Sequence, residues 1–465
     1  MPGTFFGINI GQSGLAAAQI GQDVTGQNIA NANTPGYSVQ TLDQAASDAY
    51  TQADRVSTLT PGLIGSGVSV SSIQRASDQF LDTQVRDANS SLQSQTAQSD
   101  ALKQVDDAFG EPSTTGLNAA LTSFFSSFQD VANTPENTGV RAAAVQQGVA
   151  LARTFQTVQA GLTAATTSLA GQSAIDVKTV NSYGTQIAAL NVSIKTSTVK
   201  GQAPNDLLDQ RGILLDKLSG LTNITTQNNS DGTVNVSIGS TALVLGPDAF
   251  SVSLSGLTAS GDLTSGTLGG IAQAQTKIAA YQTQLNTAAA SVVSQVNAAQ
   301  ANGLDLNGNA GTSFFTATTG SEASTIAVNP DLETNPSHLA AASVPTLSAT
   351  FASGDGSNAQ TIAGLLTKTV TAVGDPLAGQ NIQGYYQSTV SSAGSSAASA
   401  LSSAATAQAA STQLTNQRSS ETGVSTDAEM VNMMKYQRAY QASAQYIQIA
   451  DGMIGTLITN LFSSN

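Results

Sequence analysis

Residues 151–169 read LARTFQTVQAGLTAATTSL, and this stretch decides the class of fold. Its apolar positions recur at alternating steps of four and three residues, the spacing that keeps side chains on one face of an α-helix. They are Leu151, Phe155, Val158, Leu162, Ala165 and Leu169. A stripe sustained over so many turns predicts a long helix packed against partners, because an isolated helix has little stability of its own.

The same spacing recurs along residues 180–194 and 271–292, and more weakly along 81–102. Thr134-Pro135 reads as an N-cap followed by proline at the first helical position, so we expect a helix to begin there. Residues 388–413 are almost entirely Ser, Ala, Thr and Gln without proline, which favours a helix because alanine has the highest helix propensity. The fold is therefore predicted to be mainly α.

A smaller β part is predicted where the period changes, between residues 221 and about 264. Thr233–Ile238 alternates polar and apolar residues, as a half-buried strand does, and Asp231-Gly232 before it is a strong hairpin-turn pair. Residues 242–245 and 250–254 continue the strand pattern. We read this segment as a small β-rich insertion that points outward.

The composition excludes several classes of protein. The 465 residues carry a net charge of −14 without a Lys/Arg cluster, which makes nucleic-acid binding a poor prospect. The absence of cysteine excludes disulfides, thiolate metal sites and cysteine nucleophiles. No run of about 20 apolar residues occurs, so we expect no membrane insertion.

Candidate sites for chemistry are weak. His338 is the single histidine and cannot form a histidine-based metal site. Asp305–Asn309 has the spaced oxygen ligands of a calcium loop, but Ala310 and Thr316 occupy the positions that need glycine and glutamate. We therefore expect an Asn/Gly-rich turn there. The sequence predicts no catalytic residue, no cofactor, no metal and no enzyme activity.

Both ends of the chain carry heptad patterns. The first segment has Ile8, Leu15, Gln22 and Ile29 in one row, and Gly11, Ala18, Thr25 and Ala32 in the other. The last segment has Met433, Tyr440, Ile447, Ile454 and Leu461 in one row, and Tyr436, Ser443, Ala450 and Leu457 in the other. These rows predict a terminal coiled-coil pair. The alternative is that each end packs on its own domain as an amphipathic helix.

Glycine is frequent in the first of these segments. Each glycine costs a helix ~1 kcal/mol relative to alanine, so the set amounts to about 5 kcal/mol if the costs add. Its members are Gly7, Gly11, Gly14, Gly21 and Gly26. We hypothesise that both ends are largely disordered in the free monomer and become a helical pair on assembly.

Two terminal motifs resemble those of a known family. Residues 28–37, NIANANTPGY, are similar to the N-terminal motif of the axial proteins of the bacterial flagellum, which include rod, hook and hook-associated proteins. Residues 429–442, EMVNMMKYQRAYQA, are similar to the C-terminal motif of the same family. The middle resembles the hook-associated members, through residues 124–141, 205–215 (NDLLDQRGILL) and 268–309. The resemblance extends from about residue 8 to residue 462.

The resemblance implies a structural component of the flagellum that joins hook to filament and forms a ring at the distal end of the hook. Its implied partners are copies of itself, the hook protein, a second junction protein and an export chaperone at the C-terminal region. It implies an extracellular location in the flagellar hook and type III export. The start of the chain lacks the features of a cleavable signal peptide, which agrees with that route.

We expect three domains. Residues 1–55 with 415–465 form a helical assembly domain containing the inner coiled coil. Residues 56–220 with 265–305 and 355–414 form a rod of long helices. Residues 221–264 form the β-rich outer insertion, with 306–354 as a further candidate part.

The predicted assembly interface combines the heptad rows with the motif residues. Thr34-Pro35-Gly36 stops the first helix, and Tyr37 suits an inter-subunit contact or, equally, a contact within the chain. Arg438 pairs with an acidic residue of a neighbour or faces solvent. The interface residues are Ile8, Leu15, Gln22, Ile29, Asn31, Asn33, Pro35, Gly36, Tyr37, Met433, Tyr436, Arg438, Tyr440, Ile447, Ile454, Leu457 and Leu461.

Two alternatives stay open. The chain could be another axial protein, a hook or distal rod subunit, although the long helical block at 124–220 argues against a β-dominated hook subunit. A secreted adhesin or hydrolase built on the same rod is the alternative from another class. A hydrolase needs a convergent polar pocket, for which the sequence offers no strong candidate.

Overall fold

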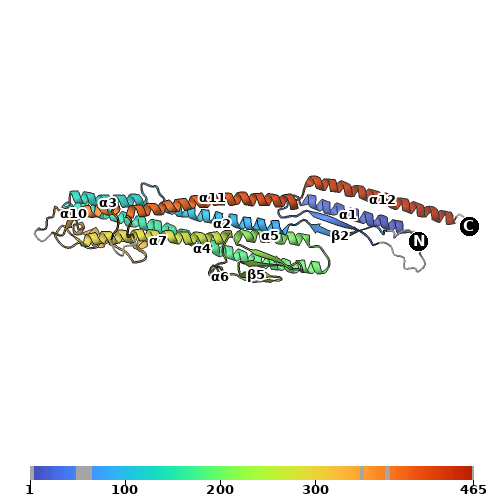
Figure 1. Cartoon of the computed structure of the whole chain (residues 1–465), viewed down its shortest axis with the longest axis horizontal. Helices are drawn as coiled ribbons and strands as arrows, with labels where there is room; N and C mark the ends of the chain where they lie inside the picture. The colour runs from blue at the N-terminus through green and yellow to red at the C-terminus, as the bar shows by residue number, and fades with distance from the viewer. Residues whose placement is uncertain (1–4, 49–64, 346–349, 372–376, 463–465) are drawn as a thin grey trace. The chain divides into compact units, whose positions relative to one another are not determined.

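The computed structural model describes residues 5–48, 65–345, 350–371 and 377–462. The chain divides into two compact units. The terminal unit comprises residues 1–89, 179–253 and 409–465, and the central unit comprises residues 90–178 and 254–408. Figure 1 shows the order of the elements along the chain.

The central unit is built from long helices. They are α3 (Leu117–Asn133), α7 (Gly266–Ala301), and parts of α2 (Gln79–Phe109), α4 (Thr138–Val199) and α11 (Ile382–Thr422). Short elements follow α7 or precede it: α6 (Leu254–Ala259), β7 (Gly303–Leu304), β8 (Phe315–Thr316), α8 (Glu322–Thr325), β9 (Ala327–Val328), α9 (Pro330–Thr334), η1 (Pro336–His338), β10 (Ala342–Ser343), α10 (Ser357–Ala363) and η2 (Gly364–Leu366). The predicted helix over 388–413 is confirmed, because α11 spans it.

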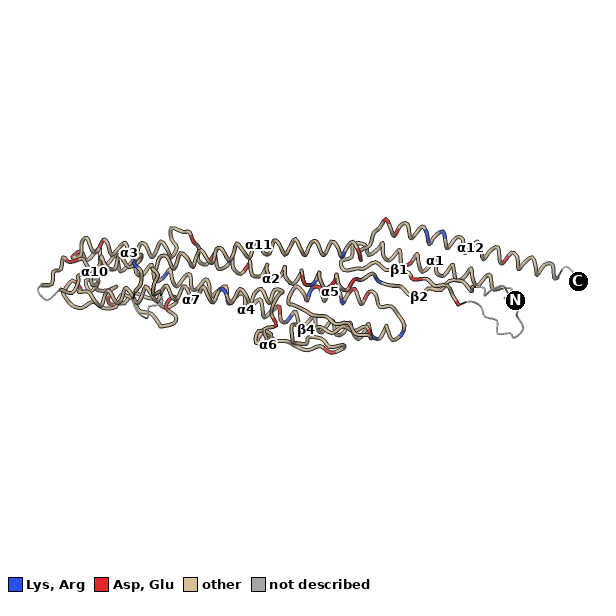
Figure 2. The backbone as a smooth tube through the Cα atoms, in the orientation of Figure 1, with Lys and Arg blue, Asp and Glu red and all other residues tan. Residues whose placement is uncertain are grey.

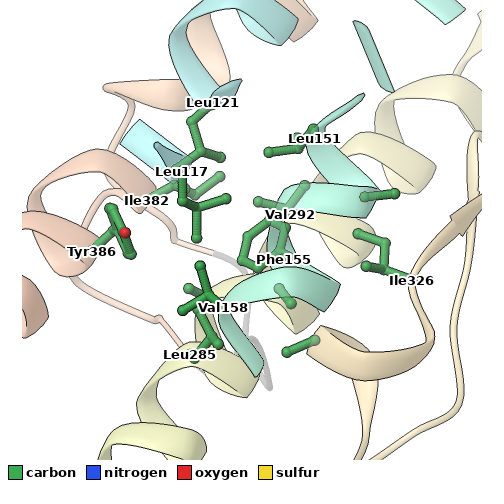
Figure 3. Packing of buried hydrophobic residues seen from close by; sticks show 14 of the residues in the cluster. Leu117, Leu121, Leu151, Phe155, Val158, Leu285, Val292, Ile326, Ile382 and Tyr386 are labelled. Carbon is green, nitrogen blue, oxygen red and sulfur yellow. The ribbon is translucent and has the colours of Figure 1, made fainter. Parts of the chain in front are cut away.

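One continuous apolar core fills the central unit. The predicted stripe from Leu151 to Leu169 is buried in it, as is the stripe of α7 from Ile271 to Val292. Figure 3 shows Leu151, Phe155 and Val158 of α4 with Leu285 and Val292 of α7 in the same cluster. Edge-to-face aromatic packing adds to this core through Phe124, Phe125, Phe128, Phe314 and Phe315.

The expected start of the long helix α4 is wrong. Thr134 ends α3 instead, since its backbone N–H donates to Asp130, and α4 begins at Thr138. Asn137 caps it, because its Oδ1 accepts from the backbone N–H groups of Gly139 (2.9 Å) and Val140 (3.3 Å). The reason is that residues 134–137 form a turn, in which the Asn137 N–H donates to the Thr134 carbonyl (3.1 Å), and the helix begins only after this turn.

The terminal unit contains α1 (Phe6–Ala30), α5 (Asn205–Leu221) and α12 (Thr426–Phe462), with two small sheets. In one sheet β1 (Gln40–Ala46) pairs antiparallel with β2 (Val68–Arg75), two strands that the sequence patterns did not identify. The other has the order β3-β4-β5-β6, from Thr225–Asn228, Val234–Ile238, Thr241–Leu245 and Asp248–Ala249.

The four-stranded sheet confirms the predicted strands at 233–238 and 242–245, which span Val234–Ile238 and Thr241–Leu245, and corrects the one at 250–254. Its last strand ends at Ala249, and α6 begins at Leu254. Val252 does not join the sheet, because its backbone bonds to a side chain. Its N–H donates to Asn181 Oδ1 (2.8 Å), and its C=O accepts from Asn181 Nδ2 (2.9 Å). The predicted fold class, mainly α with a smaller β part, is confirmed.

Candidate functional site

Helices α1 and α12 of the terminal unit pack side by side along their lengths (Figure 1). Glycines of α1 line the contact. A Cβ placed on Gly11 would lie 2.5 Å from Ile447 Cγ1, and one placed on Gly21 would lie 2.5 Å from Tyr436 Cδ1. Side chains of α12 therefore occupy the space that glycine leaves, and the cost of glycine to helix propensity is offset by close packing between the helices.

The terminal helical pair is thus present within one chain, but the residues at the centre of the contact differ from those predicted. In α1 the buried residues are Gly11, Ala17, Ala18, Gly21, Thr25 and Asn28, whereas Ile8, Leu15, Gln22 and Ile29 are only half-buried. Small residues lie at the centre because they let the two backbones approach closely. That the ends are disordered in the free monomer stays a prediction.

The other predicted interface residues lie in varied environments. Asn31, Tyr37, Met433, Tyr436, Ile447 and Ile454 are half-buried, and Asn33, Pro35, Gly36, Arg438, Tyr440 and Leu457 are exposed. Leu461 falls in α12, but its side chain lies outside the described residues. Their contact with a neighbouring subunit stays a prediction.

Asn28 is the hub of the N-terminal motif and is fully buried. Its Nδ2 donates to the Gln40 carbonyl (2.8 Å) and to Glu429 Oε2 (3.0 Å). Its Oδ1 accepts from the Tyr37 hydroxyl (2.8 Å) and from the Gln40 N–H (3.0 Å). One amide therefore joins α1, β1 and α12, and every hydrogen-bonding position of that amide is used.

The turn after α1 positions Tyr37. Gly36 has a φ of +79°, which favours glycine, and a Cβ there would lie 2.5 Å from Ile213 Cγ1. Burial, and then the charges of Asp206, Asp209 and Glu429, raise the pKa of Tyr37 to about 12. The hydroxyl therefore stays protonated and donates to Asn28 at neutral pH.

Acidic residues of α5 connect the motif to the rest of the terminal unit. Asp209 accepts from the Ser38 N–H (3.2 Å) and forms an ion pair with Arg75. Asp216 pairs with Arg86 (2.9 Å) and with Arg418 (2.7 Å). Figure 2 shows acidic and basic residues close together at α5.

An exposed apolar face runs along α12. Ile449 and Met453 are 64% and 65% exposed, and Met430, Val431, Met434, Leu457 and Ile458 are each at least half exposed. Helices rarely expose so many large apolar side chains unless another surface covers them. The pair of α1 and α12 can therefore accept further apolar partners.

Three family models match the chain. The flagellar hook-associated protein FlgK helical domain matches residues 102–315. The flagella basal body rod protein model matches residues 8–37, and the flagellar basal body rod FlgEFG protein C-terminal model matches residues 415–461. These segments contain the helical block and the two terminal motifs described above.

Relatives extend over nearly the whole chain. Flagellar hook-associated protein 1 of Bacillus subtilis (strain 168) is 27% identical, with 99% of each chain covered. The protein of the same name from Escherichia coli (strain K12) is 26% identical, covering 97% of this chain and 99% of the relative. This chain belongs to the flagellar hook-associated protein 1 family.

A solved structure agrees in fold with this family assignment. The flagellar hook junction protein FlgK from Burkholderia pseudomallei matches with a TM-score of 0.64 at 18% identity, over 73% of this chain and all of that one. Membership in the hook-associated protein 1 family makes the chain a structural component of the external bacterial flagellum that assembles with other axial proteins.

Several residues that organise the site in this family member were not selected from the sequence. Asn28 and Glu429 lie inside the quoted motifs, and Asp209 lies inside NDLLDQRGILL. Their places inside the quoted motifs were a usable signal. Their hydrogen-bond partners could not be predicted from the sequence, because Asn28 and Glu429 are 401 positions apart.

The expected turn at Asp305 is confirmed for this hook-associated protein. Asp305 Oδ1 accepts from the backbone N–H groups of Asn307 and Asn309, each at 2.8 Å. Among the described residues, no group of acidic or histidine side chains has the geometry to hold a metal ion. Within that same part of the chain, no helix is both long enough and apolar enough to cross a membrane.

Proposed function

We propose that this chain joins the flagellar hook to the filament and assembles with its own copies as a ring at the distal end of the hook. The observation that carries the proposal is the exposed apolar face of α12, a helix whose other side already packs on the glycines of α1. In the ring, this face packs against neighbouring copies, and burial of its apolar surface supplies the free energy of assembly.

The proposed partners follow from the family. They are the hook protein, a second junction protein and an export chaperone that binds the C-terminal region, and export uses the type III route without a cleavable signal peptide. Residues 1–55 with 415–465 serve as the assembly domain, 56–220 with 265–305 and 355–414 as the rod, and 221–264 as the outer insertion. The order of α1 and α12 increases when copies meet, which amide hydrogen exchange before and after assembly measures.

A pair of matched substitutions tests the role of α12. Ile449→Glu places a charge on the apolar face, whereas Ile175→Glu places the same charge on an exposed site of α4, at 59% exposure. We expect Ile449→Glu to give hooks without filaments and flagellin shed into the medium, seen by electron microscopy. We expect Ile175→Glu to leave filaments intact. Normal filaments on cells that carry only the Ile449→Glu chain would refute the proposal.

A related axial role, as a hook or distal rod subunit, would give a different result. Cells without the chain would then lack complete hooks or rods rather than filaments alone. Electron microscopy of the deletion strain therefore separates the roles. The helical domain match at residues 102–315 supports the junction role over the other two.

A further inference from the structure

The terminal unit contains a cavity of about 360 Å³ between the start of α2, helix α5 and the β3–β4 hairpin. Three arginines line it, namely Arg75, Arg86 and Arg211. Among the lining residues that the structure describes, Asp82 is the one acidic side chain. Asp209 and Asp216 form ion pairs with Arg75 and Arg86, so Arg211 is the lining arginine whose charge needs explaining.

Arg211 is buried without a carboxylate partner. It is 8% exposed, and its Nη1 donates to Asn191 Oδ1 (3.0 Å) and to the Gly232 carbonyl (2.8 Å), which are both neutral acceptors. Within the described part of the chain, the ion pairs of this unit involve other basic residues. A buried cation without a counter-charge is costly, so the site favours an anion from outside.

The two neighbouring arginines increase this preference. Arg75 forms an ion pair through Nε with Asp209, and Arg86 forms one through Nε with Asp216. Both arginine side chains also line the cavity. Burial, and then the charges of Arg75 and Arg86, lower the pKa of Arg211 to about 10. Repulsion among like charges is what an entering anion would relieve.

The side chains present select the kind of anion. Guanidinium groups are planar and donate two parallel hydrogen bonds, which match the oxygens of carboxylate and phosphate groups. We propose that the cavity bounded by Arg75, Arg86 and Arg211 binds an oxyanion, supplied by free inorganic phosphate or by a carboxylate side chain of a second copy of the chain. This site is independent of the proposed junction role.

The test uses a variant that fills the cavity with charge. Arg211 itself is unsuitable, because it also holds Asn191 and the hairpin at Gly232. Thr83 is exposed on α2, lines the cavity and donates to the Gln79 carbonyl (2.9 Å). Thr83→Glu therefore supplies an internal carboxylate to the arginines.

The matched control is Thr122→Glu on α3. Thr122 is exposed, and its hydroxyl makes the same kind of bond, to the Asn118 carbonyl (2.9 Å), so the control loses the same interaction away from the cavity. The thermal midpoint of the full-length chain is measured while phosphate replaces chloride at constant ionic strength. The control also corrects for the general stabilisation that phosphate gives to proteins.

We expect phosphate at about ten times its Kd to raise the midpoint of the wild-type and Thr122→Glu chains by roughly 2 °C more than that of Thr83→Glu. Sedimentation velocity over a range of protein concentrations then identifies the source of the oxyanion. If a second copy supplies it, the wild-type chain self-associates, and both phosphate and Thr83→Glu weaken the association. If phosphate is the ligand, self-association does not respond to either.

Two results would overturn the site. One is a wild-type chain with neither a specific phosphate shift nor phosphate-sensitive association. The other is an equal phosphate response in Thr83→Glu and Thr122→Glu. In either case Arg211 serves only to hold the hairpin.

Discussion

In the central unit, Phe124 and Phe128 are fully buried and Phe125 is 1% exposed, whereas in the terminal unit α12 leaves Ile449 and Met453 about two-thirds exposed. The first region uses its large apolar side chains for its own core. The second packs its helices through glycine and keeps large side chains on the outside. The difference shows that the central unit uses its large apolar side chains for its own core, while the terminal unit leaves apolar surface available for the contacts between copies that we propose.

The largest effect should come from the aromatic core. Phe124→Ala removes a ring that packs against Phe125, Phe128 and Phe314, and we expect it to lower the free energy of unfolding of the central unit by about 3–5 kcal/mol. Phe250→Ala is the control, because Phe250 is 47% exposed and the change should cost less than about 0.5 kcal/mol. Chemical denaturation measures both, and equal costs would contradict the comparison.

The glycine contact gives the next effect. Gly21→Ala forces a Cβ against the Tyr436 ring, and we expect the terminal pair to lose about 1–2 kcal/mol after the gain in helix propensity is subtracted. Gly171→Ala, in α4, meets nothing within 4 Å and should gain ~1 kcal/mol. Amide hydrogen exchange measures the local stability of α1 in the Gly21→Ala chain and of α4 in the Gly171→Ala chain. A stabilised α1 in the Gly21 variant would show that the contact is looser than described.

A smaller effect should follow at the motif hub. Tyr37→Phe removes the donor to Asn28 Oδ1, for which we expect a loss of about 1 kcal/mol. Tyr440 is exposed, with no hydrogen bond from its hydroxyl in the described part of the chain, so Tyr440→Phe should leave stability unchanged. Exchange rates near β1 are the measurement. If the two variants match, the hub contributes little to the terminal unit.

The last expected effect is a dependence on alkaline pH. The pKa of Tyr37 is raised from its usual value of 10.0 to about 12, so its stabilising contribution is present below pH 10 and is lost as pH rises from 10 to 12. A phenolate absorbance titration of the wild-type chain minus Tyr37→Phe should show one tyrosine that ionises near pH 12. Burial, and then the charge of Glu111, also raise the pKa of Tyr386 in the central unit. A difference curve centred at pH 10 would contradict the claim that burial and nearby carboxylates raise the pKa of Tyr37.

Helical periodicity carried most of the fold information. The stripe from Leu151 to Leu169 predicted its own burial, because spacing along one helix is a local property that needs no knowledge of the partner. Helix boundaries were less accessible. Asn137 rather than Thr134 caps α4, and the difference depends on where the chain turns between two helices.

The sequence by itself determined the long helices, the strands at 234–238 and 242–245, the family motifs and the pairing of the chain's two ends. Only the tertiary structure decided that glycines and Asn28, rather than Ile8 and Leu15, lie at the centre of that pair. It also decided that Arg211 is buried without a counter-charge. The physical reason is distance along the chain. Periodicity arises between neighbours, whereas close packing and buried hydrogen bonds depend on residues brought together from remote segments.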